Sequence, residues 1–136
     1  MRVCLDTNVL IAAFATRGLC ADVFRAVIAE HDLVIGDVIV EELRRVLTVK
    51  FKVPADRIAA VEAVFAPFPC LPKPAAPGPE AIRDPADRWV FATAIDGRAE
   101  VLVTGDRGLL ALQDTASIRI LNPRAFWELL RAGGTG

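Results

Sequence analysis

Short apolar runs alternate with longer segments of helical periodicity along this chain. Four of the runs are rich in Val, Ile and Leu and end at polar or turn residues: Arg2–Leu5, Asp32–Ile35, Val101–Thr104 and Ile118–Leu121. Such runs are typical of short buried strands, and an extended piece around Cys70 is a fifth candidate. Because strands and helices alternate, the pattern favours an α/β fold with a mainly parallel sheet.

The segments between these strands have apolar residues at helical spacing, as in the pairs Val23 with Val27 and Phe24 with Ile28. Residues that favour helix starts support this reading, with Asp37 as a predicted N-cap. We expect helices over residues 8–14, 21–30, 38–49, 54–65, 85–96, 107–112 and 123–131. The apolar faces at 23–28 and 58–65 leave room for a dimer surface.

The 136 residues, of which 54% are hydrophobic, suit one domain with one core. We expect a single domain over residues 1–132 and a flexible tail over residues 133–136. Residues 67–79 hold many of the 9 prolines but are too few to separate two domains. No apolar run reaches the ~18 residues that a membrane helix needs. Asp6 interrupts the layout of a signal peptide, so we expect a soluble, cytoplasmic protein without a membrane partner.

The composition excludes several kinds of chemistry. With one His, His31, one Ser, Ser117, and no Tyr, the chain lacks material for a Ser-His-Asp triad or a His-rich zinc site. Cys4, Cys20 and Cys70 fit neither a metal spacing nor a disulfide framework. The net charge of -1 gives no overall attraction to nucleic acid. Most basic residues are Arg. This bias has two interpretations: arginine favours bidentate phosphate contacts, or the gene comes from a GC-rich genome.

The acidic residues remain as candidates for chemistry. Asp6 and Asp106 each follow a buried strand and open a helix, so either alone is most simply an N-cap. Parallel strands place their carboxyl ends at one edge of a sheet, where ligands bind, and this favours a joint site. Glu42 flanks the apolar face of its helix, whereas Glu41 points to solvent. Glu42 can thus reach an internal site, the alternative being an ordinary boundary glutamate.

Two further acids lie in the segment RDPADRWVF. Asp84 precedes Pro85 and is best interpreted as an N-cap and support, while Asp87 shares an inward face with Val90 and is interpreted as a ligand. Clustered carboxylates require neutralisation, and oxygen-only ligation suits Mg²⁺ or Mn²⁺. Candidate polar supports or water positioners are Thr7, Asn8 and Thr104, with the start of the first helix as an alternative role for Asn8.

Four segments together resemble the signature segments of PIN domains: LDTNVLIAA, EELRRVL, RDPADRWVFATA and LVTGDRGLL. Their order and spacing match over essentially the whole chain, and the chain is most similar to PIN toxins of bacterial type II toxin–antitoxin systems, either VapC-like or of the related putative-toxin PIN group. The resemblance implies a three-layer α/β/α sandwich with about five strands. It also implies metal-dependent ribonuclease activity, homodimerisation and a cognate antitoxin. It maps the acidic quartet of the family onto Asp6, Glu42, Asp87 and Asp106.

Two positions depart from the family pattern. Arg88 follows the third acid, where Asn is common, and Gly108 stands where a second acid often follows Asp106. The quartet itself is intact, so we expect activity, with one or two metal ions. Candidate phosphate contacts, each with an ordinary solvated charge as its alternative, are Arg17, Arg44, Arg45, Lys50, Lys52, Arg88 and Arg107.

The resulting hypothesis is a metal-dependent endoribonuclease. Asp6, Asp87 and Asp106 hold Mg²⁺ or Mn²⁺, Glu42 helps to bind the ion or to activate water, and hydrolysis leaves a 5′ phosphate and a 3′ hydroxyl. One alternative is an acid-cluster phosphatase, which is disfavoured because Asn8 stands where that chemistry needs a second Asp. Another is a PIN-like module that binds RNA or a partner without cutting.

Overall fold

Five parallel strands form one sheet in the order β3-β2-β1-β4-β5 in this computed structural model, which describes residues 1–113 and 116–133. The strands are β1 (Arg2–Leu5), β2 (Asp32–Gly36), β3 (Cys70–Leu71), β4 (Val101–Val103) and β5 (Arg119–Leu121). β1 therefore lies at the centre of the sheet. Of the tail predicted over residues 133–136, only Gly133 is among the described residues, and it ends the last helix.

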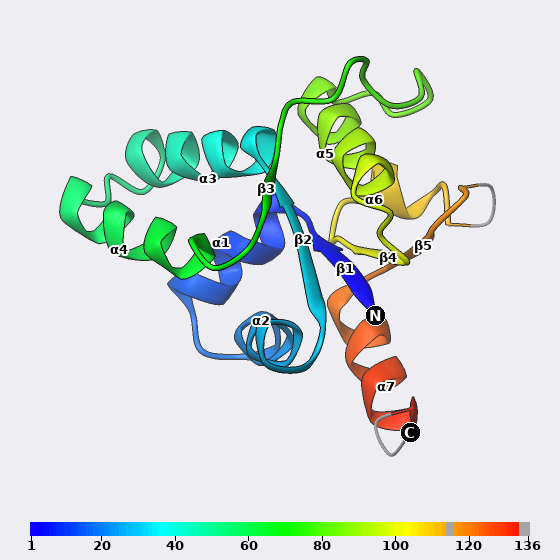
Figure 1. The fold of residues 1–136 in the computed structure, drawn as a ribbon, viewed down its shortest axis with the longest axis horizontal. Coiled ribbons are helices and arrows are strands. Elements are labelled where there is room, and N and C mark those ends of the chain that lie inside the picture. Colours follow the sequence, from blue (N-terminus) through cyan, green and yellow to red (C-terminus); the bar gives the residue numbers. More distant parts are fainter. Residues whose placement is uncertain (114–115, 134–136) are drawn as a thin grey trace.

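Seven helices cover the sheet in the described part of the chain. They are α1 (Thr7–Ala15), α2 (Leu19–Glu30), α3 (Asp37–Val49), α4 (Ala55–Phe65), α5 (Pro85–Asp96), α6 (Arg107–Leu110) and α7 (Pro123–Gly133). Figure 1 shows α1 to α4 gathered on one side of the central strands and α5 and α6 on the other. The predicted α/β/α sandwich with a parallel sheet of about five strands is confirmed.

The parallel register brings the ends of the two central strands together. Val3 pairs with Val101, and Leu5 pairs with Val103. The backbone N–H of Asp6 then donates to the carbonyl of Val103 over 2.9 Å, so that Asp6 stays beside the end of β4. Residues that follow β1 and residues that follow β4 consequently meet at the same carboxyl edge of the sheet.

Beyond their first residues, the central strands β1, β2 and β4 are apolar and buried, because helices cover both faces of the sheet. Val3 and Cys4 have no exposed surface. On the side of α1 to α4, the rings of Phe14, Phe24 and Phe65 pack with centroids 5.2 to 6.0 Å apart and join α1, α2 and α4. Phe24 and Phe65 of the two apolar faces are thus buried within one chain, and the expectation of a dimer surface at these faces stays a prediction.

Several predicted boundaries are corrected by the structure. Asp37 does not cap α3 with its side chain but is the first residue of that helix, and its carboxylate accepts a hydrogen bond from the Cys70 thiol over 3.2 Å. The backbone before it is fixed by close packing, since a Cβ on Gly36 would lie 2.8 Å from a methyl carbon of Thr93 in α5. Thr104 lies just outside β4, and α6 ends at residue 110 rather than 112. No helix of the described residues has the length and apolarity to cross a bilayer.

Candidate active site

A chain of hydrogen bonds organises the carboxyl edge of the sheet around Asp6. This carboxylate is 2% exposed. One of its oxygens accepts from the backbone N–H of Thr7 over 2.7 Å, and the other accepts from the Thr104 hydroxyl over 2.7 Å. The Thr104 oxygen in turn accepts from the backbone N–H of Asp106 over 2.9 Å. Thr104 therefore ties the end of β1 to the turn after β4.

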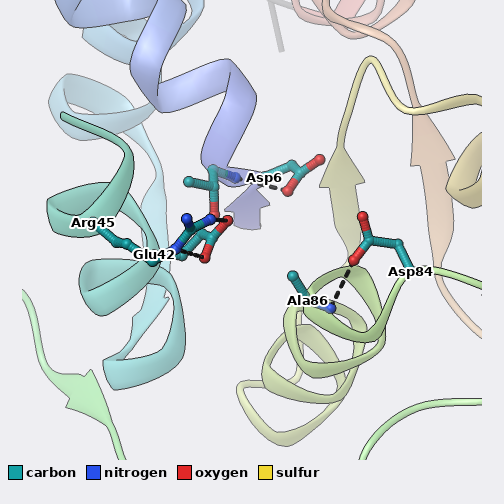
Figure 2. Close-up of polar contacts among 6 residues, drawn as sticks. Asp6, Glu42, Arg45, Asp84 and Ala86 are labelled. Atoms are coloured by element: carbon teal, nitrogen blue, oxygen red, sulfur yellow. Dashed lines mark hydrogen bonds and ion pairs between the residues drawn. The ribbon is translucent and has the colours of Figure 1, made fainter. Parts of the chain in front are cut away.

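Two of the neighbouring acids cap helices, as the sequence predicts. Asp106 accepts from the backbone N–H of Leu109 over 3.0 Å at the start of α6. Asp84 accepts from the backbone N–H of Ala86 over 2.8 Å at the start of α5, as Figure 2 shows. A cap occupies one oxygen of a carboxylate, so capping is compatible with a second contact through the other oxygen.

Asp87 completes the group from the first turn of α5, where its side chain is 9% exposed. The pKa of Asp87 is raised to about 7, first by burial, then by repulsion from Asp6, Asp106 and Asp84, and by a hydrogen bond with the Asp106 carboxyl. Burial also raises the pKa of Asp6, which its hydrogen bonds from Thr104 and Thr7 oppose. The four aspartates are thus close enough to act on one another. Three of them, Asp84, Asp87 and Asp106, line a cavity of about 310 Å³.

Glu42 is placed differently. On α3 its carboxylate is held in a two-pronged ion pair by the Arg45 guanidinium, with N–O distances of 2.9 and 3.2 Å. Figure 2 shows this pair on α3, apart from Asp84 at the start of α5. In the described residues, no three His, Cys, Asp or Glu side chains converge as a ready-made metal-ligand set. The structure brings four aspartates together, while Glu42 is engaged by its neighbour.

One buried atom beside the aspartates lacks a partner. The hydroxyl oxygen of Thr7 is enclosed and makes no hydrogen bond within the described protein, although nearly all buried polar groups have one. Thr7 follows Asp6 directly. The side chains offered here are carboxylates and hydroxyls, the hard oxygen donors that Mg²⁺ and Mn²⁺ prefer. The residues present therefore fit a hydrated divalent cation.

Some of the other predicted residues bind groups of the protein through their side chains, and others are exposed to solvent. Arg44 pairs with Glu62, and Arg88 donates to the carbonyl of Gly78 over 3.0 Å, so both have structural partners. Asn8, Arg17, Lys50, Lys52 and Arg107 are exposed. Sequence reasoning missed Trp89, which lines a cavity beside Glu42. The sequence feature that could have indicated Trp89 is its position, as an aromatic residue two positions after the candidate ligand Asp87.

All four predicted acids lie within residues 2–108, the span that matches the family profile of the PIN domain. The chain belongs to the PIN domain family. This PIN domain superposes on a chain from the crystal structure of VapBC2 from Rickettsia felis bound to a promoter DNA fragment, with a TM-score of 0.60 and 14% identity. It superposes on a chain of FitAcB from Neisseria gonorrhoeae with a TM-score of 0.61 and 22% identity. Each alignment covers 90% of the PIN domain and 98% of the other chain. Among curated protein sequences, none matches it significantly.

Proposed function

We propose that this PIN domain is a metal-dependent endoribonuclease that hydrolyses RNA phosphodiesters with Mg²⁺ or Mn²⁺. The observation that carries the proposal is the group of four interacting aspartates at the carboxyl edge of the sheet, with the pKa of Asp87 raised to about 7. Carboxylates that lie close together repel one another and lower the stability of the folded state, and a bound divalent cation offsets this repulsion. Membership of the PIN family and the unpartnered Thr7 hydroxyl support the same conclusion.

In this proposal Asp6, Asp87 and Asp106 hold the cation. The Thr104 hydroxyl orients Asp6 by donating to its carboxylate and fixes Asp106 by accepting from its backbone N–H, while Asp84 caps the helix that carries Asp87. A cation bound there would acidify a water molecule and offset charge on a phosphodiester.

Glu42 is assigned to binding the cation or to orienting the attacking water. To reach the aspartates it must release Arg45, whose guanidinium is then free to pair with a phosphate of the substrate. Hydrolysis in this arrangement leaves a 5′ phosphate and a 3′ hydroxyl. Arg17, Lys50, Lys52 and Arg107 stay candidates for contacts with more distant phosphates.

We further propose that the protein is the toxin component of a bacterial type II toxin–antitoxin system. The support is the resemblance of its four sequence segments to VapC-like toxins together with its fold similarity to chains of the VapBC2 and FitAcB crystal structures. A cognate antitoxin, a homodimeric state and a cytoplasmic location belong to this proposal. Co-purification with the product of the neighbouring open reading frame tests the antitoxin.

The nuclease proposal is tested by incubating purified protein with structured RNAs and Mn²⁺. The comparison is between the wild type, Asp6→Asn and the control Asp32→Asn, which changes an exposed aspartate at the start of β2. We expect cleavage by the wild type and by Asp32→Asn and none by Asp6→Asn. Equal cleavage by all three would show that the activity comes from a contaminant and would refute the assignment.

A second candidate function is a module that binds RNA or a partner without cutting. The ion pair between Glu42 and Arg45 favours it, because it engages one member of the acidic quartet. The glycine at position 108 favours it as well. RNA binding by the wild type without cleavage under any divalent cation would select this candidate.

A further inference from the structure

A second cavity, of about 300 Å³, is lined by residues of α3 and α5. Its lining includes Glu42 from α3 and Ala86 and Trp89 from α5. Ala86 and Trp89 are three positions apart and share one helix face, whereas Asp87 turns to the neighbouring face and lines the cavity of the aspartates. The start of α5 thus contributes residues to both the acidic cavity and this second one.

The second cavity has an aromatic wall. Trp89 is half-buried, and the Lys73 ammonium lies over its ring, 4.3 Å from the ring centroid. This cation–π contact restrains the indole. An indole fixed in the wall of an open cavity is the type of surface on which a nucleobase stacks.

The charged groups of the cavity balance one another and leave polar groups for an uncharged ligand. Glu41 and Glu42 contribute two carboxylates and Arg45 one guanidinium. The guanidinium is already paired with Glu42, and the exposed Glu41 carboxylate accepts no hydrogen bond within the described residues. The lining, with the Lys73 ammonium over Trp89, carries two carboxylates and two cations, so it has no net charge. It offers a free acceptor on Glu41 and remaining N–H donors on Arg45, which suit the edge of a base with an exocyclic amine.

We propose that this cavity binds the nucleobase adjacent to the scissile phosphate, stacked on Trp89, with Glu41 accepting a hydrogen bond from its exocyclic amine. The inference rests on the proposed nuclease function for its place in the reaction. It assigns base selection to α3 and α5. Adenine, cytosine and guanine carry the amine that Glu41 can accept, whereas uracil lacks it.

Uncharged nucleosides test the pocket independently of metal binding and cleavage. The chain has 2 Trp residues, and Trp127 lies on α7 in the lining of another cavity with Met1 and His31. In ¹⁵N-labelled protein, the Trp127→Phe variant identifies the indole N–H signal of Trp89. We expect millimolar adenosine to shift the Trp89 signal saturably and to leave the Trp127 signal in place, with a weaker effect of uridine and none of ribose 5-phosphate.

Two outcomes of this titration overturn the proposal: an unmoved Trp89 signal, or equal shifts of both indole signals. An equal response to adenosine and uridine overturns the role of Glu41.

Cleavage kinetics give the second readout. We expect Trp89→Leu to raise KM roughly 10-fold or more, as loss of one base stack does, with little change in kcat. Trp89→Phe should restore most of the affinity, which a merely structural role of the indole would not produce. Cleavage with unchanged KM in Trp89→Leu overturns the pocket. A shift of the Trp89 signal in a protein that cuts no RNA supports the pocket and refutes the nuclease proposal instead.

Discussion

Replacing Asp87 by Asn should stabilise the metal-free protein at neutral and higher pH. The carboxyl of Asp87 has its pKa raised from 3.8 to about 7 by burial and by the charges of Asp6, Asp106 and Asp84. The folded state therefore binds this proton more tightly than the unfolded chain does. It follows that the free energy of unfolding falls as the pH rises from about 4 to about 7.

The size of this effect follows from the difference between the two pKa values. A rise of about 3 pKa units corresponds to ~4 kcal/mol for a fully enclosed carboxylate. Asp87 also lines an open cavity with Asp84 and Asp106, where water and salt screen its charge. We therefore expect Asp87→Asn to gain about 1–2 kcal/mol over the wild type at pH 8.

Urea denaturation in EDTA at several pH values measures the gain. The difference between Asp87→Asn and the wild type should be largest above pH 7 and should shrink as the pH falls toward about 3, below both pKa values, where the wild-type carboxyl becomes protonated in both states. Asp32→Asn, which alters an exposed aspartate, should show no such trend. A difference that is independent of pH, or a loss of stability at pH 8, would refute this account of the aspartate group.

Three further changes test other parts of the structure. Thr104→Val removes the hydroxyl that serves Asp6 and the turn after β4, and should lower the free energy of unfolding by about 1–3 kcal/mol in urea. The same variant should reduce RNA cleavage about 10-fold in a rate assay, since the orientation of Asp6 is lost. Gly97→Ala places a Cβ 2.2 Å from a methyl carbon of β2 and should destabilise by about 1–3 kcal/mol, whereas Gly105→Ala, with open space around it, should not. Saturating Mn²⁺ should abolish the neutral-pH advantage of Asp87→Asn in thermal unfolding, because the cation offsets the repulsion only where the carboxylate is present.

The sequence predicted the sheet because parallel strands covered on both faces must be short and apolar throughout. The same logic placed Asp6 and Asp106 at one edge, where Thr104 links them. Side-chain partners were harder to foresee. The spacing of Glu42 and Arg45 permits an ion pair along α3 but does not require one, since each side chain has other rotamers.

The hydrophobic periodicity of the sequence could not predict hydrogen bonds between residues that are distant in sequence. Arg88 appeared as a candidate for phosphate binding, but it donates to the carbonyl of Gly78 in the proline-rich loop, a contact that depends on where that loop crosses α5. Asp37 matched the pattern of an N-cap, yet the pairing of β2 with β3 brings the Cys70 thiol to its carboxylate. In both cases the partner is distant in sequence, and local propensity carries no information about it.

Calorimetric titration with Mn²⁺ tests the central claim, that the aspartate group holds a divalent cation. Wild type, Asp6→Asn and the control Asp32→Asn are compared at pH 8, above the raised pKa of Asp87. The account predicts binding to the wild type and to Asp32→Asn, and an affinity at least about 10-fold lower for Asp6→Asn. Equal affinity for all three proteins would contradict it.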